Sequence, residues 1–303
     1  MKVLILGGTG MLGSMVAKCM PDEWEVQATA RVRPPLPYDL VNLRWRRFDV
    51  GHPGWEDDLG ELMTGQDWVV NCLGATKPLM GESAASVVNA VLPCQIAAMC
   101  QVVGARMIHA STDCVYDGSQ GLRREEDPSS ARDEYGVAKA QGEPPGGIVF
   151  RCSLVGPECR APARYLLGKT LGGLVGQGYT DHLWNGLTTL HWARLVVAAI
   201  RSGVALPSPL HLVPEGVATK DRLLRMILRA FTVAGLDLEA VRSGMPADMR
   251  LATSCPGTLA RLWRLAGYDP PPTIEQMLQE LADFCRVELW PPNQHQYWGR
   301  RQP

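Results

Sequence analysis

Short apolar runs alternate with longer amphipathic stretches through the first half of the chain. The runs lack the polar alternation of half-exposed strands, so we expect strands that are buried on both faces. They cover residues 2–6, 25–30, 46–50, 68–73, 106–111 and 147–153. Because helical stretches separate them, the pattern predicts a Rossmann-type α/β fold, in which helices cover both faces of a doubly wound parallel sheet.

Helical patterns dominate after residue 153, with turns rich in glycine and proline between them. They cover residues 161–172, 189–202, 219–235, 256–266 and 273–285, and an isolated apolar run covers 209–213. We therefore expect a nucleotide-binding domain over 1–155, rejoined by 182–213, and a smaller, mainly helical substrate domain over 156–303. The polar end of the chain, 291–303, indicates an extended arm or disorder.

One earlier helical stretch, residues 83–103, contains Pro93. A proline at that place predicts a bend or a new helix start, because it cannot donate the hydrogen bond that the helix interior requires.

Composition narrows the range of partners. The chain has 30 basic and 31 acidic residues, so it lacks the overall positive field that would hold nucleic acid or an anionic membrane. Nine cysteines form no CxxC pair and no Cys/His cluster, so we expect reduced thiols, no metal site and a cytoplasmic protein. The first apolar run stops at Gly7, too early for a signal peptide, and no run approaches the length of a membrane span.

A glycine-rich turn joins the first predicted strand to an apolar helix. Residues 7–13 read Gly-Gly-Thr-Gly-Met-Leu-Gly, with the spacing G-x-x-G-x-x-G. Such a turn brings backbone N–H groups and a helix N-terminus to a pyrophosphate, and a Cβ at the glycines would block that approach. A plain tight turn is the alternative. We predict that the turn contacts a dinucleotide through Gly7, Thr9, Gly10, Met11, Leu12 and Gly13.

Arginines follow the second predicted strand, at the place where an NAD-specific protein usually has an acidic residue for the ribose 2′-hydroxyl. Arg31 and Arg33 suit a 2′-phosphate, so the sequence favours NADP(H) over NAD(H), with a solvated basic loop as the alternative. Asp49, with Val50 beside it, closes the third predicted strand and is a candidate for the adenine, although a strand-end cap is equally plausible. The remaining predicted cofactor contacts are Cys72, Leu73, Gly74, Ala75 and Cys152.

Tyr135 and Lys139 are separated by four positions, which places them on one face of a helix. A phenol with a pKa of about 10 transfers protons poorly at neutral pH, and a nearby ammonium lowers that pKa by favouring the phenolate. Lys139 can also hold the nicotinamide ribose. Thr112, at the end of the fifth predicted strand, can hydrogen-bond the substrate oxygen.

Together these segments resemble the extended short-chain dehydrogenase/reductases, and within them the dTDP-4-dehydrorhamnose reductase branch. The resemblance is carried by Gly7–Gly13, by Ser-Thr-Asp-Cys-Val-Tyr-Asp-Gly at 111–118, by Tyr135–Lys139 with Gly142-Glu143, and by Arg151-Cys152-Ser153. It covers residues 1–155 well and continues more thinly through 184–189. The resemblance implies that Thr112 is the catalytic hydroxyl, Tyr135 the proton donor and Lys139 its modulator, in an NADPH-dependent reduction of a keto group on a nucleotide-linked deoxysugar.

Neighbouring activities remain as alternatives. Related sugar-nucleotide dehydratases carry an Asp-Glu pair where this chain has Asp113-Cys114, which disfavours elimination. Epimerases recycle tightly bound NAD(H), and Arg31 favours a consumed NADPH instead. A cofactor-binding regulatory subunit of another enzyme and a reductase of a non-sugar carbonyl stay open. Because the Tyr135 helix ends before Pro144, the usual homodimer interface of the superfamily is in doubt, and a homodimer is left open.

Substrate contacts are expected from cationic, aromatic and hydrogen-bonding side chains after the predicted strands and in the 184–189 loop. The predicted set is Thr76, Lys77, Asp113, Val115, Arg151, Trp184, Asn185 and Thr188. Asn89 has two interpretations: in the resembling family this residue often faces the active site, whereas a helix-interior asparagine that is satisfied locally is equally expected.

Overall fold

The computed structural model describes residues 1–32, 43–77, 80, 85–158 and 165–289. Arg33 and the segment 291–303 lie outside these ranges, so the predictions made for them stay untested.

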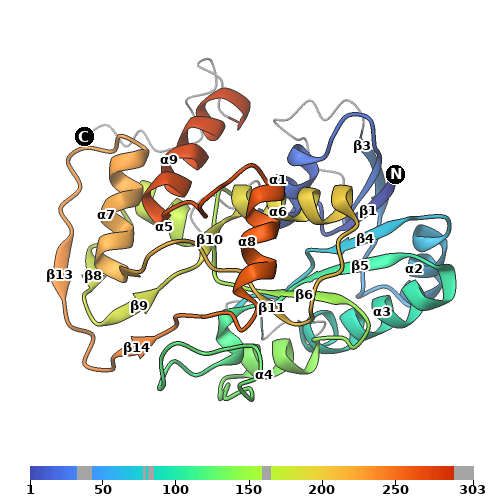
Figure 1. The fold of residues 1–303 in the computed structure, drawn as a ribbon, viewed down its shortest axis with the longest axis horizontal. Coiled ribbons are helices and arrows are strands. Elements are labelled where there is room, and N and C mark those ends of the chain that lie inside the picture. The colour runs from blue at the N-terminus through green and yellow to red at the C-terminus, as the bar shows by residue number, and fades with distance from the viewer. Residues whose placement is uncertain (33–42, 78–79, 81–84, 159–164, 290–303) are drawn as a thin grey trace.

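A seven-stranded parallel sheet forms the centre of the molecule, in the order β11-β6-β5-β4-β1-β2-β3 (Figure 1). Its strands are β1 (Lys2–Leu6), β2 (Glu25–Ala30), β3 (Leu43–Arg47), β4 (Trp68–Asn71), β5 (Arg106–Ala110), β6 (Ile148–Arg151) and β11 (Leu210–His211). The strand order reverses between β1 and β4, and ligands of doubly wound sheets bind at the carboxyl ends of strands near such a reversal. The predicted fold class is confirmed.

The third strand lies three residues earlier in the chain than predicted. β3 covers residues 43–47 rather than 46–50, so Asp49 and Val50 follow the strand instead of closing it. Leu43 and Trp45 alternate with exposed arginines at 44 and 46, because β3 is the edge strand of the sheet. An edge strand does not show the continuous apolar run of the central strands.

Helices cover both faces of the sheet (Figure 1). Successive strand residues point to opposite faces, so Val3 and Ile5 pack with α1 (Met11–Cys19) and α6 (Thr189–Ser202). Leu4 and Leu6 pack on the other face with α2 (Trp55–Met63) and α3 (Leu92–Val103). The isolated apolar run supplies β11, which pairs with β6.

The helix interrupted by Pro93 restarts as predicted. Five residues of π-helix, η2 (Val87–Val91), precede α3, and Pro93 occupies the first turn of α3. In that turn its missing N–H has no partner to lose. Short π-helical turns are frequent at functional sites, and this one lies beside the predicted cofactor turn.

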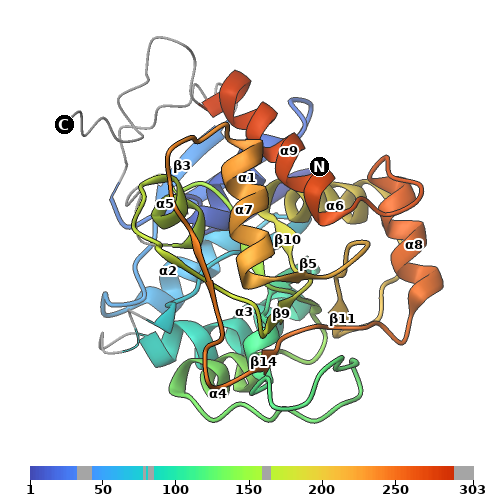
Figure 2. The same cartoon turned by 90° about the vertical axis from the view of Figure 1, so that its left-hand side faces the viewer.

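The remaining helices and short strands lie to one side of the main sheet (Figures 1 and 2). The helices are α5 (Leu166–Leu171), α7 (Lys220–Ala230), α8 (Pro256–Leu265) and α9 (Ile274–Phe284), followed by η4 (Cys285–Leu289). The strands form three small sheets: β7 (Leu154–Val155) with β10 (Leu187–Thr188), β8 (Gln177–Tyr179) with β13 (Glu239–Val241), and β9 (His182–Trp184) between β12 (Ala218–Thr219) and β14 (Ala247–Asp248). The chain leaves the main sheet after β6 and rejoins it at β11, and the division into two domains stays a prediction.

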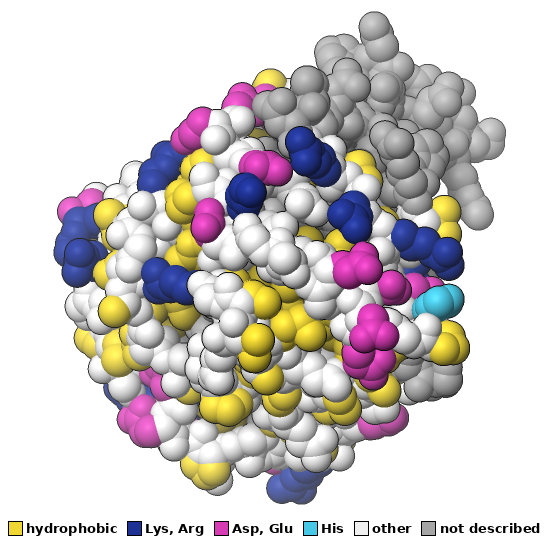
Figure 3. Space-filling view, turned by 90° about the vertical axis from the view of Figure 1, so that its right-hand side faces the viewer, with side chains coloured by type: hydrophobic (Ala, Val, Ile, Leu, Met, Phe, Trp, Pro, Cys, Tyr) yellow, Lys and Arg dark blue, Asp and Glu magenta, His cyan; other side chains and the backbone are white. Residues whose placement is uncertain are grey.

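The surface carries charges of both signs, which are interspersed on the face shown in Figure 3. Among the described residues, no helix is both long and apolar enough to cross a bilayer. In the same residues, no three His, Cys, Asp or Glu side chains gather in a way that would hold a metal ion. The eight described cysteines are free thiols.

Candidate active site

The β1–α1 turn uses its glycines for different physical reasons. Gly7 has a φ of +81°, and a Cβ on Gly13 would lie 2.3 Å from the carbonyl oxygen of Gly7. Gly10 donates to that same oxygen at 2.9 Å and precedes Met11, the first residue of α1. The first N–H groups of a helix lack partners within it, and at a side-chain-free turn they are open to an anion. The turn therefore fits a dinucleotide pyrophosphate.

A second turn, residues 72–75, lies against the glycine turn. A Cβ on Gly7 would be 3.0 Å from the side chain of Leu73. Asn89 holds this second turn from the π-helical segment: its Oδ1 accepts from the N–H of Ala75 at 3.0 Å, and its Nδ2 donates to the carbonyl of Ala75 at 2.7 Å. Asn89 is thus satisfied locally and shapes the turn instead of facing the site.

The predicted adenine side of the site is placed only in part. Arg31 is exposed and directly follows β2, which pairs with β1. Asp49 accepts from the N–H of Gly51 at 3.1 Å, the local cap that was the alternative interpretation. Val50 packs beside Phe48, and Cys152 is buried in the core, so contacts of these side chains with a cofactor stay predictions.

Thr112 stands at the carboxyl end of β5 and caps the short helix η3 (Asp113–Val115). Its Oγ1 accepts from the N–H of Cys114 at 3.1 Å and donates to Oδ1 of Asp113 at 3.0 Å. Thr112 also interacts with the hydroxyl of Tyr135, and this interaction lowers the pKa of the phenol. The structure therefore brings together two of the three residues predicted to be catalytic.

The helix that carries Tyr135 and Lys139 is α4 (Glu134–Gln141), and it packs on its neighbours at backbone distance. A Cβ on Gly136 would lie 2.2 Å from the carbonyl oxygen of Cys114, and one on Gly142 would lie 1.8 Å from that of Asn89. These two glycines let α4 approach η3 and η2 closely enough for Tyr135 to reach Thr112. The helix ends before Pro144, as the sequence predicts.

The pKa of Tyr135 differs from the sequence-based expectation. Burial raises it, the neighbouring Cys114 and Asp113 raise it further, and the hydrogen bond with Thr112 lowers it. Lys139 does not turn toward the phenol: its Nζ donates to the carbonyl of Ala110 at 2.8 Å. The expectation of a lowered phenol pKa is therefore wrong for the protein without a cofactor, because desolvation dominates.

Burial raises the pKa of two more groups at the end of β5. Burial raises the pKa of the Cys114 thiol to about 12, so it is not a base at neutral pH. This supports the exclusion of the dehydratase reaction. Burial also raises the pKa of Asp113, although hydrogen bonds from Thr112, Cys114 and Ser153 oppose that shift.

The sequence analysis missed two residues of this site. Lys220, the first residue of α7, is partly buried and interacts electrostatically with Asp113. The hydroxyl of Tyr165 lies 3.2 Å from Oγ1 of Thr76, and Tyr165 also raises the pKa of Tyr135. Neither position has a local signal, since a lysine at a helix start is normally a solvated residue.

Several predicted substrate residues keep groups that a ligand can reach. Lys77 is exposed, and its ammonium lies 2.8 Å from the carboxylate of Asp133, the N-cap residue of α4. Trp184 is half-buried, and its ring packs over Gly186. Thr76 is half-buried and Asp113 is buried, and contacts of all four side chains with a substrate stay predictions.

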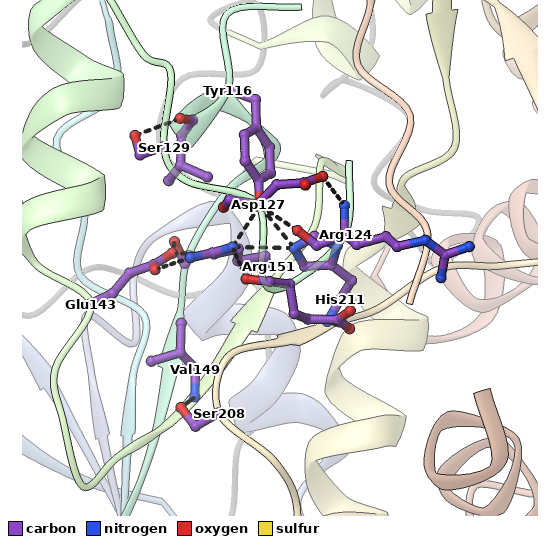
Figure 4. A network of polar contacts seen from close by, with 12 residues as sticks. Tyr116, Arg124, Asp127, Ser129, Glu143, Val149, Arg151, Ser208 and His211 are labelled. Carbon is purple, nitrogen blue, oxygen red and sulfur yellow. Dashed lines mark hydrogen bonds and ion pairs between the residues drawn. The ribbon is translucent and has the colours of Figure 1, made fainter. Parts of the chain in front are cut away.

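Arg151 was predicted to contact the substrate, but the structure places its guanidinium in a buried internal network. Nε and Nη2 donate to the two carboxylate oxygens of Glu143 at 2.8 and 2.6 Å, and Nη1 donates to the hydroxyl of Tyr116 at 2.7 Å. Figure 4 shows the guanidinium between these two partners. Ser111, next to Thr112, donates to the same carboxylate at 2.6 Å. Arg151 thus links the ends of β5 and β6 from a buried position, and its contact with a substrate phosphate stays a prediction.

Three other residues that were predicted to contact the substrate also have internal partners. The amide of Asn185 is used by the backbone of Leu251, at 2.7 Å from Nδ2 and 2.9 Å from Oδ1. Thr188 caps α6, and its hydroxyl lies 2.7 Å from Nδ1 of His191. Val115 is fully buried in a hydrophobic cluster. Each of these side chains is buried, and its contact with a substrate stays a prediction.

Comparisons with known proteins agree with this geometry. The model of the family described as RmlD substrate binding domain matches residues 1–145. The dTDP-4-dehydrorhamnose reductase of Mycobacterium tuberculosis is 30% identical over 296 residues, covering 89% of this chain and 88% of that protein. The crystal structure of dTDP-4-dehydrorhamnose reductase from Bacillus anthracis in complex with NADP is similar with a TM-score of 0.70 and 18% identity, covering 92% of this chain and 98% of that one. The bovine methionine adenosyltransferase 2 subunit beta is 30% identical over 146 residues, 47% of this chain and 41% of that protein.

Proposed function

Because this chain belongs to the dTDP-4-dehydrorhamnose reductase family of extended short-chain dehydrogenase/reductases, we propose that it reduces a keto group on a nucleotide-linked deoxysugar with NADPH. Members of this family are NAD(P)-dependent oxidoreductases. The observation that carries the proposal is the meeting of Tyr135 and Thr112 at the carboxyl end of β5, in a sheet whose first turn fits a dinucleotide.

Different residues of the chain have different roles in this reaction. When it is bound, NADPH supplies the hydride. The N–H groups at the start of α1 hold the pyrophosphate, and Arg31 holds the 2′-phosphate. Thr112 orients the keto oxygen, and Tyr135 donates the proton to that oxygen as the negative charge develops. Because burial raises the pKa of Tyr135, its phenol is protonated at neutral pH, as a proton donor must be.

Substrate recognition is assigned to the residues on the other side of Thr112. Lys77, Tyr165 and Lys220 offer two cations and a hydroxyl to the diphosphate and the sugar, and Trp184 offers an aromatic face. Lys139 supports Tyr135 from the next turn of α4.

Replacement of the phenol tests the reaction. We expect Tyr135→Phe to lower kcat for NADPH oxidation with a dTDP-4-keto-6-deoxysugar by about 10²–10⁴-fold, since general-acid catalysis contributes that much. Binding of NADPH, measured by fluorescence titration, should stay within about twofold, because a change confined to the transition state does not alter ground-state binding. Tyr179→Phe, in β8 and stacked on His182, is the matched control and should keep its activity. Full turnover by Tyr135→Phe would refute the assignment.

Arg31 carries the proposed preference for NADPH. We expect NADPH to raise the melting temperature more than NADH at equal concentration, because the tighter ligand stabilises the folded state more. Arg31→Asp should reverse this order, since a carboxylate repels the 2′-phosphate and accepts from a 2′-hydroxyl. An unchanged order in the variant would remove Arg31 from the cofactor site.

A second candidate rests on the similarity to the methionine adenosyltransferase 2 subunit beta, whose name describes a subunit of another enzyme. In that case the chain would bind NADPH without turning over any keto sugar nucleotide, and it would co-purify with an unrelated enzyme. Turnover that depends on Tyr135 separates the two candidates.

A further inference from the structure

A buried row of polar groups runs behind Lys139, from the end of β4 across β5. Asn71 and His109 are partners in the β4–β5 register, and both are fully buried. Nδ2 of Asn71 lies 3.1 Å from Nδ1 of His109, and Nε2 of His109 lies 3.3 Å from Nζ of Lys139. The row ends where Lys139 donates to the carbonyl of Ala110 at 2.8 Å. The proposed reaction uses neither Asn71 nor His109.

The direction of the hydrogen bonds follows from Asn71. Its Oδ1 accepts from the N–H of Leu73 at 3.1 Å, so the amide nitrogen is the atom that faces His109. An amide nitrogen only donates, and Nδ1 of His109 must therefore accept. A neutral imidazole with a lone pair on Nδ1 carries its proton on Nε2. Burial lowers the pKa of His109 well below its ordinary value, in agreement with a neutral ring.

The proton on Nε2 restricts the state of Lys139. An ammonium has no lone pair and cannot accept from an N–H group, whereas a neutral amine accepts one hydrogen bond and donates two. Only with an amine at Lys139 do all the groups from Asn71 to Ala110 pair donor to acceptor in one direction.

We propose that His109, oriented by Asn71, is a positioning residue that favours the neutral amine of Lys139 in the cofactor-free site. This inference rests on the proposed function only where it concerns catalysis, because Lys139 supports Tyr135 in the proposed reaction.

The other groups that face Lys139 come from the end of α4, from β4 and from β5. Burial lowers the pKa of Lys139 to about 8, while Glu143, just after α4, and Cys72, after β4, oppose that shift. His109 is the group on β5. Because both ionisable neighbours favour the ammonium, the N–H of His109 is the polar contact that favours the amine.

The direct test is NMR of the cofactor-free protein. In protein labelled with ¹⁵N-histidine, the ring nitrogens of His109 should show the Nε2–H tautomer. In protein labelled with ¹³C-lysine, the Cε signal of Lys139, assigned with Lys139→Met, should titrate well below the other lysines. In His109→Gln the amide oxygen can turn to the ammonium, so the midpoint should rise by about one pH unit. The matched control, His191→Gln, replaces an equally buried histidine in α6 and should leave the midpoint unchanged.

A second variant tests the same proposal if His109→Gln does not fold. Asn71→Asp keeps the bond from Leu73 and accepts from Nδ1–H, which turns the lone pair of Nε2 toward Lys139 and should also raise the midpoint. An Nδ1–H tautomer in the wild type, or a Lys139 midpoint that neither variant moves, would overturn the proposal. The outcome is independent of the proposed reaction, since the titration can be repeated in Tyr135→Phe. If the reaction is also as proposed, the high-pH limb of kcat should move with the midpoint in His109→Gln.

Discussion

At the scale of single residues, Glu143 and Arg151 form a buried ion pair near the site. Its side chains are only about one-tenth exposed, and the separation is 2.6 Å. Removal of one partner leaves the other charge buried without compensation, which costs roughly 3–5 kcal/mol. We therefore expect Arg151→Met to lower the free energy of unfolding in urea by that amount. Arg201→Met, which breaks the exposed pair with Glu23, should cost less than about 1 kcal/mol. Equal effects would contradict the structural role of Arg151.

The same residues show what could be predicted from the sequence. Thr112, Tyr135 and Lys139 could be proposed from the sequence because their chemistry depends on local spacing and on the end of a strand. The internal partners of Arg151 and Asn185 could not be predicted, because a residue type does not reveal its partner: the amide of Asn185 bonds a backbone 66 positions away. Lys220 was missed for the converse reason, since only the tertiary fold brings the start of α7 to Asp113.

At the scale of elements, the position of α4, the helix that carries Tyr135 and Lys139, depends on Gly136. A helical glycine is usually less stable than alanine by about 1 kcal/mol, so the substitution normally stabilises. At Gly136 the added Cβ would meet the Cys114 carbonyl at 2.2 Å, so we expect Gly136→Ala to destabilise by roughly 1–3 kcal/mol and to lower kcat by displacing Tyr135. Gly60→Ala in α2 is the control, because the nearest atom there is the Met99 methyl at 3.9 Å. Thermal unfolding of both variants gives the comparison, and a stabilised Gly136→Ala would show that α4 is free to move.

The elements themselves were predicted well where burial imposes one period along the whole segment. Six of the seven strands of the main sheet and the helices at 189–202 and 256–266 correspond to predicted runs, whereas β3 is displaced from its predicted place. The small sheets were not predicted, because strands of two or three residues are too short to show a period.

At the scale of the whole molecule, a polar cluster joins α6 to α9. His191 is buried in α6, its Nε2 lies 3.0 Å from the hydroxyl of Tyr268, and that hydroxyl donates to Glu280 of α9 at 2.7 Å. Arg194 contacts both Tyr268 and Glu280. The hydrogen bond with His191 is the largest cause that lowers the pKa of Glu280 to about 2. The cluster therefore links α6, which covers one face of the main sheet, to the C-terminal helix α9.

This cluster should make stability depend on pH. A carboxyl group whose folded-state pKa is lowered stabilises fully above its unfolded pKa of about 4.3 and loses that contribution as the pH falls toward 2. We expect Glu280→Gln to lower the urea midpoint at pH 7, with a difference from wild type that shrinks between pH 4.5 and pH 2. Glu275→Gln, on the same helix in an exposed pair with Arg229, should show little difference at any pH. A pH-independent effect of Glu280→Gln would mean that packing, not charge, joins the helices.

The late position of α6 and β11 in the chain has a consequence during synthesis. When residue 155 leaves the ribosome, six strands of the main sheet exist, but the helix that buries Trp192 and Leu195 against the α1 face has not been made. The nascent first half therefore presents an uncovered apolar face, with the cofactor turn and the catalytic helix already translated. Only the emergence of residues 189–211 closes that face, so the part that carries the chemistry matures after most of the chain has been translated.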